Sequence, residues 1–301
     1  MMDLGRLRAL HAVAVHGSVG GAAASLGFTP SAVSQQISKL ERETRTVLLE
    51  RQGRGVVLTD AARELASTAQ RVLALVEQAE VTLEEQRGQA VGRLLMASFA
   101  TGARGLLPGA LADLRARCPG LDVRLLETDP YLAAELVARG EVDLALVQDW
   151  PTVPLPVQPE LSRLDLGEDP VDLLLWEGHP LAELAVVPVS RLLGQRWISV
   201  PPGNICHDWL VRTMREAGEE PDVAFQIGEF ETQIALIRAG LGLGLVPRLG
   251  RGALPPGVLA RPVAPEPARR VFVLWRTRTS RRPAVAEALT AIRGRWAALG
   301  A

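Results

Sequence analysis

One predicted helix presents a face of short polar side chains, the residue types that read another molecule through hydrogen bonds. The helix is expected to begin at Thr29 and Pro30, because a threonine oxygen caps a free N–H at a helix start and proline has no N–H to lose there. Its apolar residues stand at spacings of four and three and so share a buried face: Val33, Ile37 and Leu40. The opposite face is neutral and rich in donors and acceptors: Ser31, Ser34, Gln35 and Ser38. Hydroxyl and amide groups suit the base edges of a DNA major groove, so this face predicts a DNA-reading helix.

Other elements must hold that helix in place. Ser18 is placed to cap a helix that ends at a tight turn at Gly27, directly before the reading helix. An earlier amphipathic helix, ending near Gly17, shares one apolar face: Leu4, Leu7, Leu10 and Ala14. Two short apolar runs around residues 52–55 predict a hairpin with Arg51 and Arg54 at its tip. Alanine-rich helical hairpins also occur in proteins that never touch DNA, but these flanks favour a winged helix-turn-helix whose wing holds the DNA backbone.

The charge available for DNA is local. The whole chain of 301 residues has a formal net charge of -1, whereas residues 1–60 have a net charge of +2. That modest excess suffices only if the bases gather on one face and a second subunit doubles them. The residues expected to contact DNA are Thr29, Pro30, Ser31, Ser34, Gln35, Ser38, Lys39, Arg51 and Arg54.

Residues 2–65 resemble the N-terminal domain of a LysR-type transcriptional regulator. The matching residues are Met2-Asp3-Leu4, Gly17-Ser18, Ala22-Ala23, Pro30-Ser31-Ala32-Val33-Ser34, Gln36-Ile37, Leu40-Glu41, Glu50-Arg51 and Leu58-Thr59. The chain departs from the family pattern at Thr44-Arg45, where Leu-Gly is usual, at Leu49 for Phe, and at Ala62 for Gly, which leaves the end of the reading helix near Arg45 open. Gln35 stands where many relatives have Arg, which bears on the base that is read. The resemblance implies double-stranded promoter or operator DNA as a partner.

A long helix without Pro or Gly is predicted over residues 61–87. Its apolar residues alternate by four and three as a heptad seam: Leu65, Ala69, Val72, Val76, Ala79 and Leu83. Such a helix either packs on its own domain or pairs with a second subunit. The resemblance implies the second case, a linker helix that joins a homodimer, with a homotetramer as the larger assembly and RNA polymerase as a further partner. Residues 88–90 then form a hinge.

The remainder of the chain alternates short apolar strands with helices. Strands are expected at 93–98, 121–126, 142–147, 171–176, 197–200, 223–227, 243–246 and 271–275. This alternation predicts an α/β fold with mostly parallel sheets, and a helix over 105–118 after the first strand. The proline-rich runs 151–159 and 255–267 predict two crossovers between lobes, so that one lobe is assembled from both ends of the segment.

This part resembles the family's two-lobed, doubly wound effector domain, which is like a type II periplasmic binding protein. Its best motifs are Gly140–Leu146 and Ala239–Pro247. The fold class is therefore α/β with an all-α-type winged helix-turn-helix head and a long linker helix. The expected divisions are 1–60 for the DNA-binding domain, 61–88 for the linker and dimerisation helix, and 89–301 for the effector-binding domain. Within the last, lobe 1 covers about 91–158 and 268–301, and lobe 2 about 159–267.

Ligands of open α/β sheets bind at the carboxyl ends of strands. The residues this rule selects for an effector are Ser98, Thr101, Gly102, Asp129, Pro130, Gln148, Pro201, Gly203, Asn204, Glu229, Phe230 and Pro247. In relatives these loops line the cleft between the lobes, and Thr101 falls where many use a hydroxyl; Ser98 and Thr101 are also placed to cap the next helix. Several loop acids would suit a cationic or amino-bearing effector, although loop acids more commonly cap helices and face solvent: Asp129, Asp149, Glu229 and Glu231.

Two other features, a cysteine and a glycine run, suggest redox sensing and nucleotide binding, but their sequence context favours neither. Cys206 opens a predicted helix, where the N-terminus would lower the pKa of the thiol. Peroxide-sensing relatives that use a cysteine in this loop need a resolving cysteine nearby, and none lies between Cys206 and the end of the sequence, which favours a plain small residue. The glycine run 240–244 follows a helix and precedes a strand, the reverse of a dinucleotide fingerprint, so no cofactor is expected.

Catalysis, metal binding and membrane insertion lack sequence support. The four histidines are scattered, and neither a Gly-x-Ser-x-Gly elbow nor a P-loop occurs, so no catalytic or metal site is expected. The start lacks a secretory signal, no apolar run approaches the ~18 residues of a membrane span, and two cysteines fit a reducing cytoplasm. The sequence therefore predicts a cytoplasmic, ligand-responsive DNA-binding regulator. The alternative is a cytoplasmic small-molecule-binding protein or enzyme with an unrelated helical head.

Overall fold

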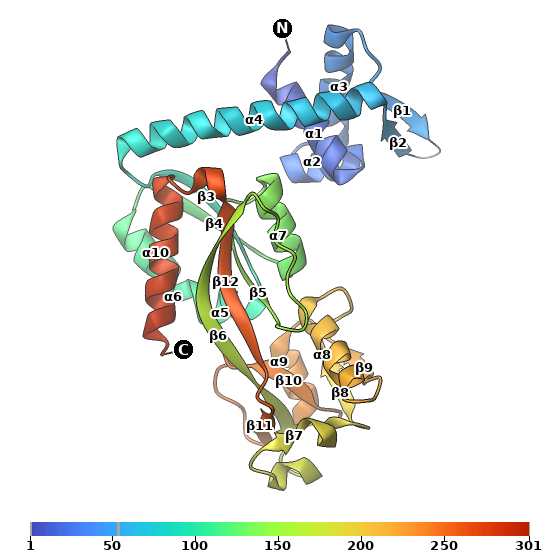
Figure 1. The fold of residues 1–301 in the computed structure, drawn as a ribbon, viewed down its shortest axis with the longest axis vertical. Coiled ribbons are helices and arrows are strands. Elements are labelled where there is room, and N and C mark those ends of the chain that lie inside the picture. The colour runs from blue at the N-terminus through green and yellow to red at the C-terminus, as the bar shows by residue number, and fades with distance from the viewer. Residues whose placement is uncertain (1, 53–54, 301) are drawn as a thin grey trace. The chain divides into compact units, whose positions relative to one another are not determined.

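The computed structural model of the chain describes residues 2–52 and 55–300. The contacts between residues divide the chain into two compact units, Met1–Arg87 and Gly88–Ala301 (Figure 1). Within the described residues no single helix is long and apolar enough to cross a membrane, although the bent pair α1 and α2, Leu4–His16 with Val19–Leu26, has that length and composition when taken together.

The first unit is a winged helix-turn-helix followed by one long helix. Its elements are α1 (Leu4–His16), α2 (Val19–Leu26), α3 (Pro30–Thr44), β1 (Leu49–Gln52), β2 (Gly55–Leu58) and α4 (Asp60–Arg87). The predicted caps form, because Ser18 Oγ accepts the N–H of Gly21 at 3.0 Å and Thr29 Oγ1 accepts the N–H of Ala32 at 3.2 Å. The predicted apolar face of α3 is fully buried: Val33, Ile37 and Leu40. β1 and β2 pair antiparallel and make the expected hairpin.

α3 ends at a left-handed residue that is not glycine. Arg45 has φ of 52°, a conformation that costs a side chain free energy and that glycine adopts freely. Glu41 holds the chain beyond this bend, because its carboxylate accepts the N–H of Leu48 at 2.8 Å and of Leu49 at 3.2 Å. The helix therefore ends at Thr44, and one carboxylate ties it to the wing.

α4 has two environments along its length. Residues of its first half are buried in the core of the unit or packed against it: Ala62, Leu65, Ala66, Ala69 and Val72. In its second half, Leu75 is 66% exposed and Leu83 is 55% exposed. The first half of the predicted seam thus packs on its own domain. In the second half, the seam residue Leu83 is exposed and Val76 is half-buried. Beside the seam, Leu75 is also exposed, whereas Val81 is buried.

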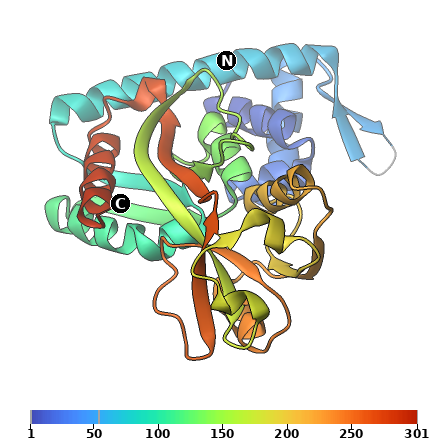
Figure 2. The ribbon, with the colours of Figure 1, turned by 60° about the horizontal axis from the view of Figure 1, so that its bottom comes forward.

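The second unit is built around a curled, mixed sheet. Its strands are β3 (Gly92–Ser98), β4 (Leu121–Glu127), β5 (Leu144–Asp149), β6 (Leu161–Trp176), β7 (Val187–Pro188), β10 (Gly244–Pro247), β11 (Val258–Ala264) and β12 (Ala268–Arg276). The order is β4-β3-β5-β12-β6-β11-β7, with β10 also on β6, and β8 (Arg196–Ser199) and β9 (Asp222–Gln226) form a separate parallel pair. β12 pairs with both β5 and β6, and the far part of β6 pairs with β10 and β11. The two long strands β6 and β12 therefore connect the lobes, and Figure 2 shows β6 and β12 side by side.

Helices cover both faces of this sheet, as a doubly wound fold requires. In the first lobe these are α5 (Ala100–Gly105), α6 (Leu107–Arg117), α7 (Pro130–Arg139) and α10 (Pro283–Ala298). In the second lobe they are α8 (Ile205–Glu216) and α9 (Phe230–Arg238), with short 3₁₀ turns at Pro180–Glu183 and Val189–Leu192. A further 3₁₀ turn, Thr277–Thr279, lies between β12 and α10. α6 and α10 pack together on one face of β5, and α7 packs on the other (Figure 1). The predicted fold class is confirmed.

Some local predictions are wrong. The strands are not mostly parallel, because β12 returns from the C-terminal end of the chain and pairs antiparallel with both β5 and β6. The run 255–267 is not simply a crossover, since it contains β11 despite its prolines. The helix expected over 105–118 begins earlier, at Ala100, and is interrupted at Leu106 between α5 and α6.

Candidate nucleic-acid interface and ligand cavity

The outward face of α3 is open to solvent. Every predicted DNA contact that the structure describes is exposed: Thr29, Pro30, Ser31, Ser34, Gln35, Ser38, Lys39 and Arg51. Thr29 Oγ1 and Ser31 Oγ lie 3.0 Å apart in a hydrogen bond, which orders the start of this face. Arg54 lies outside the described residues. The arrangement is a row of hydrogen-bonding groups on a helix that its buried side holds rigid, which is what base recognition needs.

A cavity of about 380 Å³ lies between the lobes of the second unit. The predicted effector residues that line it are Thr101, Asp129, Pro130, Gln148, Asn204, Glu229 and Phe230. Its volume is in the range of small-molecule sites. Within the described residues no group of His, Cys, Asp and Glu could hold a metal ion.

The other predicted effector residues lie elsewhere. Ser98 is fully buried, and its hydroxyl donates to the carbonyl of Phe99 at 3.0 Å. Gly102 packs so closely against Leu146 and Phe99 that it has no room for a side chain. Pro201 and Gly203 are exposed to solvent outside the cavity, and Pro247 lines a smaller adjoining space of about 20 Å³.

Asp129 joins the two lobes at the cavity wall. Its carboxylate accepts the N–H of Tyr131 at 2.9 Å, as a cap of α7, and the N–H of Ile205 at 3.3 Å, from the start of α8. Burial raises the pKa of Asp129 above its usual value in spite of these hydrogen bonds, and the like charge of Asp208 raises it further. The carboxylate is therefore incompletely compensated for its lost hydration.

Two further helix starts at the cavity are capped by its wall. Asn204 Oδ1 accepts the N–H of Cys206 at 2.9 Å at the start of α8. Glu229 accepts the N–H of Glu231 at 2.8 Å, and from Thr232 both the N–H at 2.6 Å and the hydroxyl at 2.8 Å. The hydrogen bonds from Thr232 and from the backbone lower the pKa of Glu229. The expectation that loop acids cap helices is confirmed for Asp129 and Glu229, both of which also line the cavity.

Thr101 belongs to a buried polar group beneath the cavity. Arg269 Nη2 donates to Thr101 Oγ1 at 2.5 Å, and the same guanidinium pairs with Asp169 through Nε at 2.9 Å and Nη2 at 2.7 Å. All three side chains are almost inaccessible to water. Neither Thr101 nor Ser98 caps α5, whose first turn has no side-chain cap. The capping prediction is therefore wrong: Phe99 occupies the N-cap position, Thr101 lies within the first turn, and the Ser98 hydroxyl donates to the carbonyl of Phe99.

Arg104 reaches from α5 to the second lobe. Its Nε donates to the carbonyl of Gly250, and its Nη1 lies 3.5 Å from the carboxylate of Glu231. The guanidinium also lies 5.9 Å from the centre of the Phe230 ring. This cation is thus engaged with groups of the opposite lobe, as Arg269 is with Asp169.

Aromatic and polar contacts also bridge the lobes. Trp150, after β5, stacks on Trp209 of α8 with ring centres 3.7 Å apart and planes 7° from parallel. Tyr131 donates its hydroxyl to Asp208 at 3.0 Å, and burial together with this acceptor raises the pKa of Tyr131 to about 12. These two contacts hold the lobes against one another.

Cys206 lines the cavity as a neutral thiol. Burial raises the pKa of Cys206 and outweighs the nearby Arg269, which acts to lower it. The expected lowering of this pKa at a helix start is therefore wrong. Gln148 Nε2 lies 3.3 Å from the Cys206 sulfur, and the other cysteine, Cys118, is buried in the core beside α6.

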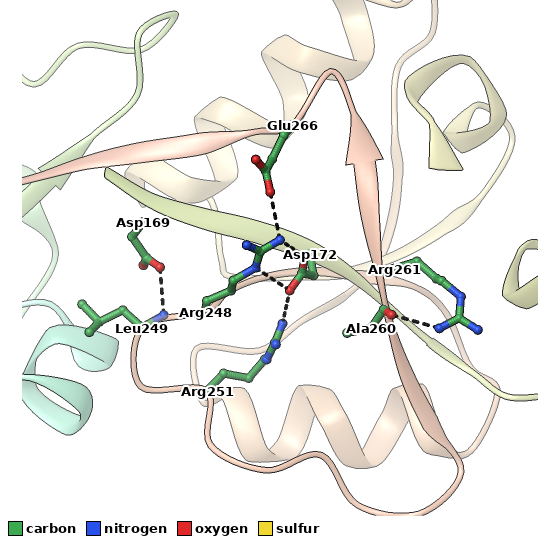
Figure 3. Close-up of polar contacts among 8 residues, drawn as sticks. All are labelled: Asp169, Asp172, Arg248, Leu249, Arg251, Ala260, Arg261 and Glu266. Atoms are coloured by element: carbon green, nitrogen blue, oxygen red, sulfur yellow. Dashed lines mark hydrogen bonds and ion pairs between the residues drawn. The ribbon is translucent and has the colours of Figure 1, made fainter. Parts of the chain in front are cut away.

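A cluster of charges surrounds Asp172, three residues beyond Asp169 along β6. In Figure 3, Arg248 and Arg251 both point at Asp172 of β6, and Glu266 approaches Arg248 from the other side. Burial raises the pKa of Asp172, but the hydrogen bonds and charges of the two arginines outweigh it and hold the pKa below its usual value. Asp169, three residues earlier, accepts the N–H of Leu249 at 2.8 Å as well as pairing with Arg269.

Sequence reasoning missed three charged residues of the wall: Arg104, Glu127 and Arg269. Arg269 could have been noticed, since it stands with Arg270 at the start of an apolar strand where charges are rare unless paired. Arg104 and Glu127 carry no comparable signal. They lie near the end of α5 and at the end of β4, where charged residues are ordinary.

Comparison with known proteins agrees with both units. Residues 4–63 match the family described as "Bacterial regulatory helix-turn-helix protein, lysR family", and residues 87–297 match "LysR substrate binding domain". The chain is 33% identical over 273 residues to "Probable HTH-type transcriptional regulator LrrA" of Synechococcus elongatus, covering 90% of this chain and 89% of that protein. It is 29% identical to "DNA-binding transcriptional dual regulator OxyR" of Escherichia coli, covering 98% and 96%.

Solved structures share the fold. A full-length OxyR variant from Pseudomonas aeruginosa superposes with a TM-score of 0.70 at 22% identity, covering 97% of this chain and 98% of that one. "Crystal Structure of full-length BenM" gives 0.60 at 22% identity, covering 99% and 98%. A winged helix-turn-helix followed by a two-lobed α/β domain defines a class of regulators that combine a DNA-binding and a substrate-binding domain, and the chain belongs to the LysR family of transcriptional regulators. Its relatives are regulators and not enzymes, as the sequence predicted.

Proposed function

We propose that this regulator binds double-stranded promoter DNA through the exposed face of α3. The observation that carries the proposal is a neutral polar face fixed by a fully buried one, with Gln35 at its centre. A glutamine amide can pair bidentately with adenine, so Gln35 and Ser31 would read bases. Arg51 and Arg54 of the wing would hold phosphates, together with Lys39.

We infer that the DNA-binding units work in pairs. The second half of α4 exposes Leu83 of the predicted seam and Leu75 beside it, and this supports pairing of two chains along the seam that contains Val76. A homodimer doubles the net charge of +2 of residues 1–60 and places two reading helices on two half-sites. A homotetramer, contact with RNA polymerase and a cytoplasmic location are further parts of the proposal. So are the divisions at 1–60, 61–88 and 89–301.

The proposed switch is a small molecule bound in the cavity. Asp129, Gln148 and Arg104 all bond across the two lobes, so an occupant that competes for them would change how the lobes close. That change would alter the angle between paired DNA-binding units. Two relatives carry the name "Hydrogen peroxide-inducible genes activator", but the raised pKa of the Cys206 thiol does not favour a peroxide-reactive thiolate here.

A titration of full-length protein on DNA tests the proposed function. Promoter fragments next to its own gene would be compared with shuffled DNA of equal length and composition at one fixed salt concentration. A fragment bound at least about a thousandfold more tightly than shuffled DNA is expected of a sequence-specific regulator. Equal binding of every fragment and its shuffled partner would overturn the proposal.

A further inference from the structure

The bases of the cavity wall are already neutralised within the chain. Arg269 is held by both Asp169 and Thr101, and Arg104 by Glu231 and a carbonyl, as described above. An anionic ligand of Arg269 would have to break its buried pair with Asp169, and breaking a buried pair is costly because the abandoned partner keeps its charge. The contact of Arg104 with Glu231 is longer and partly exposed, so it holds Arg104 less firmly. Arg269, the more deeply buried base of the wall, is therefore structural and poorly available to a ligand.

The acids of the wall have no such partners. Within the described residues, neither Asp129 nor Glu127 forms an ion pair, and the charged group that most affects Asp129 is another acid, Asp208. Glu229 accepts three hydrogen bonds from its own helix start, and Arg104 acts on it only through space, as the weakest influence on its pKa. Three carboxylates thus face one cavity with little compensating charge.

The helix starts do not reverse this balance. A free helix N-terminus attracts anions because its N–H groups point outward. Here Asp129, Asn204 and Glu229 already accept those N–H groups on α7, α8 and α9. The N–H groups at these helix starts are therefore already bonded to side chains of the wall, and two of the three capping side chains, Asp129 and Glu229, carry a negative charge.

An independent observation is an amide oxygen at the cavity, that of Gln148, which lacks a hydrogen-bond donor. Gln148 is 1% exposed and lines the cavity, and while its Nε2 contacts the Cys206 sulfur, its Oε1 has no hydrogen-bond partner within the described residues. A buried acceptor without a partner has lost its hydration and gained nothing in return, which costs the folded protein free energy. A ligand that brings N–H donors would recover that free energy, whereas a ligand that brings only acceptors would not.

We propose that the cavity takes a small organic cation with a primary or secondary ammonium group, recognised by Asp129, Glu229 and the Gln148 amide oxygen. This inference rests on the proposed function of the cavity as an effector site. The Phe230 ring supplies an apolar wall whose face already lies 5.9 Å from one cation, that of Arg104, so a second cation there is chemically apt. The volume of about 380 Å³ suits a compact molecule.

Matched sets of compounds test the ligand class on the full-length protein. Each carbon skeleton is offered as amine, alcohol and carboxylate: butylamine, butanol and butyrate; benzylamine, benzyl alcohol and benzoate; putrescine, butanediol and succinate. Thermal midpoints and calorimetric titrations measure binding, because only a ligand of the folded state raises the midpoint. At least one amine is expected to bind about tenfold or more tightly than its alcohol, the equivalent of one ionic hydrogen bond, with no binding of its carboxylate.

Variants then place the amine in the cavity. Asp129→Asn and Glu229→Gln keep an oxygen for the helix cap and remove the charge, so each should weaken amine binding by about tenfold or more. Glu135→Gln is the matched control, since Glu135 lies on α7 like the Asp129 cap but pairs with Arg139 on the surface. It should leave the dissociation constant unchanged.

The outcomes separate this inference from the proposed function. Carboxylates or alcohols that bind as tightly as the amines would overturn the ligand class and leave the cavity as an effector site. Amine binding that Glu135→Gln weakens as much as the two cavity variants would also overturn it. If no compound binds, the ammonium ligand is wrong, while the promoter titration still decides DNA recognition independently.

Discussion

The outward face of α3 and the wall of the cavity are both polar, but they treat their polar groups differently. On α3 the hydroxyl and amide groups of Ser34, Gln35 and Ser38 are left to solvent. In the cavity, most donors and acceptors are bound to other parts of the chain, and the Arg269 guanidinium alone engages two residues. The exposed donors and acceptors of α3 can therefore form hydrogen bonds to another molecule without breaking bonds inside the chain. The cavity wall keeps only a few groups open, such as the Gln148 amide oxygen, so under the proposed function an occupant would use these groups and compete for some of the internal bonds.

The largest expected effect lies on the surface that would join two DNA-binding units. Val76→Asp would bury an unpaired charge in the α4 seam of each subunit, at about 3–5 kcal/mol for each charge. We expect the dimer to dissociate and tight binding to a two-half-site operator to be lost. Light scattering and DNA titration of the full chain measure the two effects.

The matched control adds the same charge two residues further along the helix, away from the seam. Gln78 is exposed on α4, so Gln78→Asp should leave both the mass and the DNA affinity unchanged. A Val76→Asp protein that keeps the mass of the wild type would show that α4 does not pair through this seam.

The next effect tests whether the buried ion pair of Arg269 with Asp169 at the cavity stabilises the fold. Arg269→Met removes the partner of Asp169, a carboxylate that is 3% exposed, and should lower the free energy of unfolding by about 3–5 kcal/mol. Arg251→Met is the control in the cluster of Figure 3, because Asp172 keeps Arg248 when Arg251 is removed. Denaturant unfolding should give Arg269→Met a clearly lower free energy of unfolding than Arg251→Met. Equal losses of unfolding free energy would mean that the Arg269–Asp169 pair stabilises the fold no more than a single arginine of the Asp172 cluster does.

The contrast between the two surfaces also explains what the sequence could reveal. The caps at Ser18 and Thr29 and the buried face of α3 are local patterns within a few residues, so they were predictable and the structure has them. Arg269 and Asp169 are one hundred residues apart in the chain, and no local pattern at either one points to the other. The residues of the cavity wall come from separate stretches of sequence between positions 99 and 269, and only the rule of strand carboxyl ends placed some of them correctly.

Strand boundaries failed for a related reason. β6 is sixteen residues long, but the sequence suggested only its last part, because polar residues and Gly167 interrupt the apolar pattern of its first part. The register with β12 shifts next to Gly167, so the strand bends where it passes from one lobe to the other. β11 was hidden by Pro262, which is tolerated there although it offers no N–H to the sheet. Such positions are decided by the neighbouring strand and not by the segment itself.

The most direct measurement is the binding of Gln35→Ala to its selected operator and to shuffled DNA, beside wild type and Arg51→Ala, over a range of salt concentrations. If α3 reads bases, Gln35→Ala should lose about 1–3 kcal/mol on the operator, chiefly at an A·T pair, and much less on shuffled DNA. Arg51→Ala should weaken both DNAs alike and reduce the salt slope by about 0.9. Equal losses on operator and shuffled DNA for Gln35→Ala would contradict sequence reading by this face.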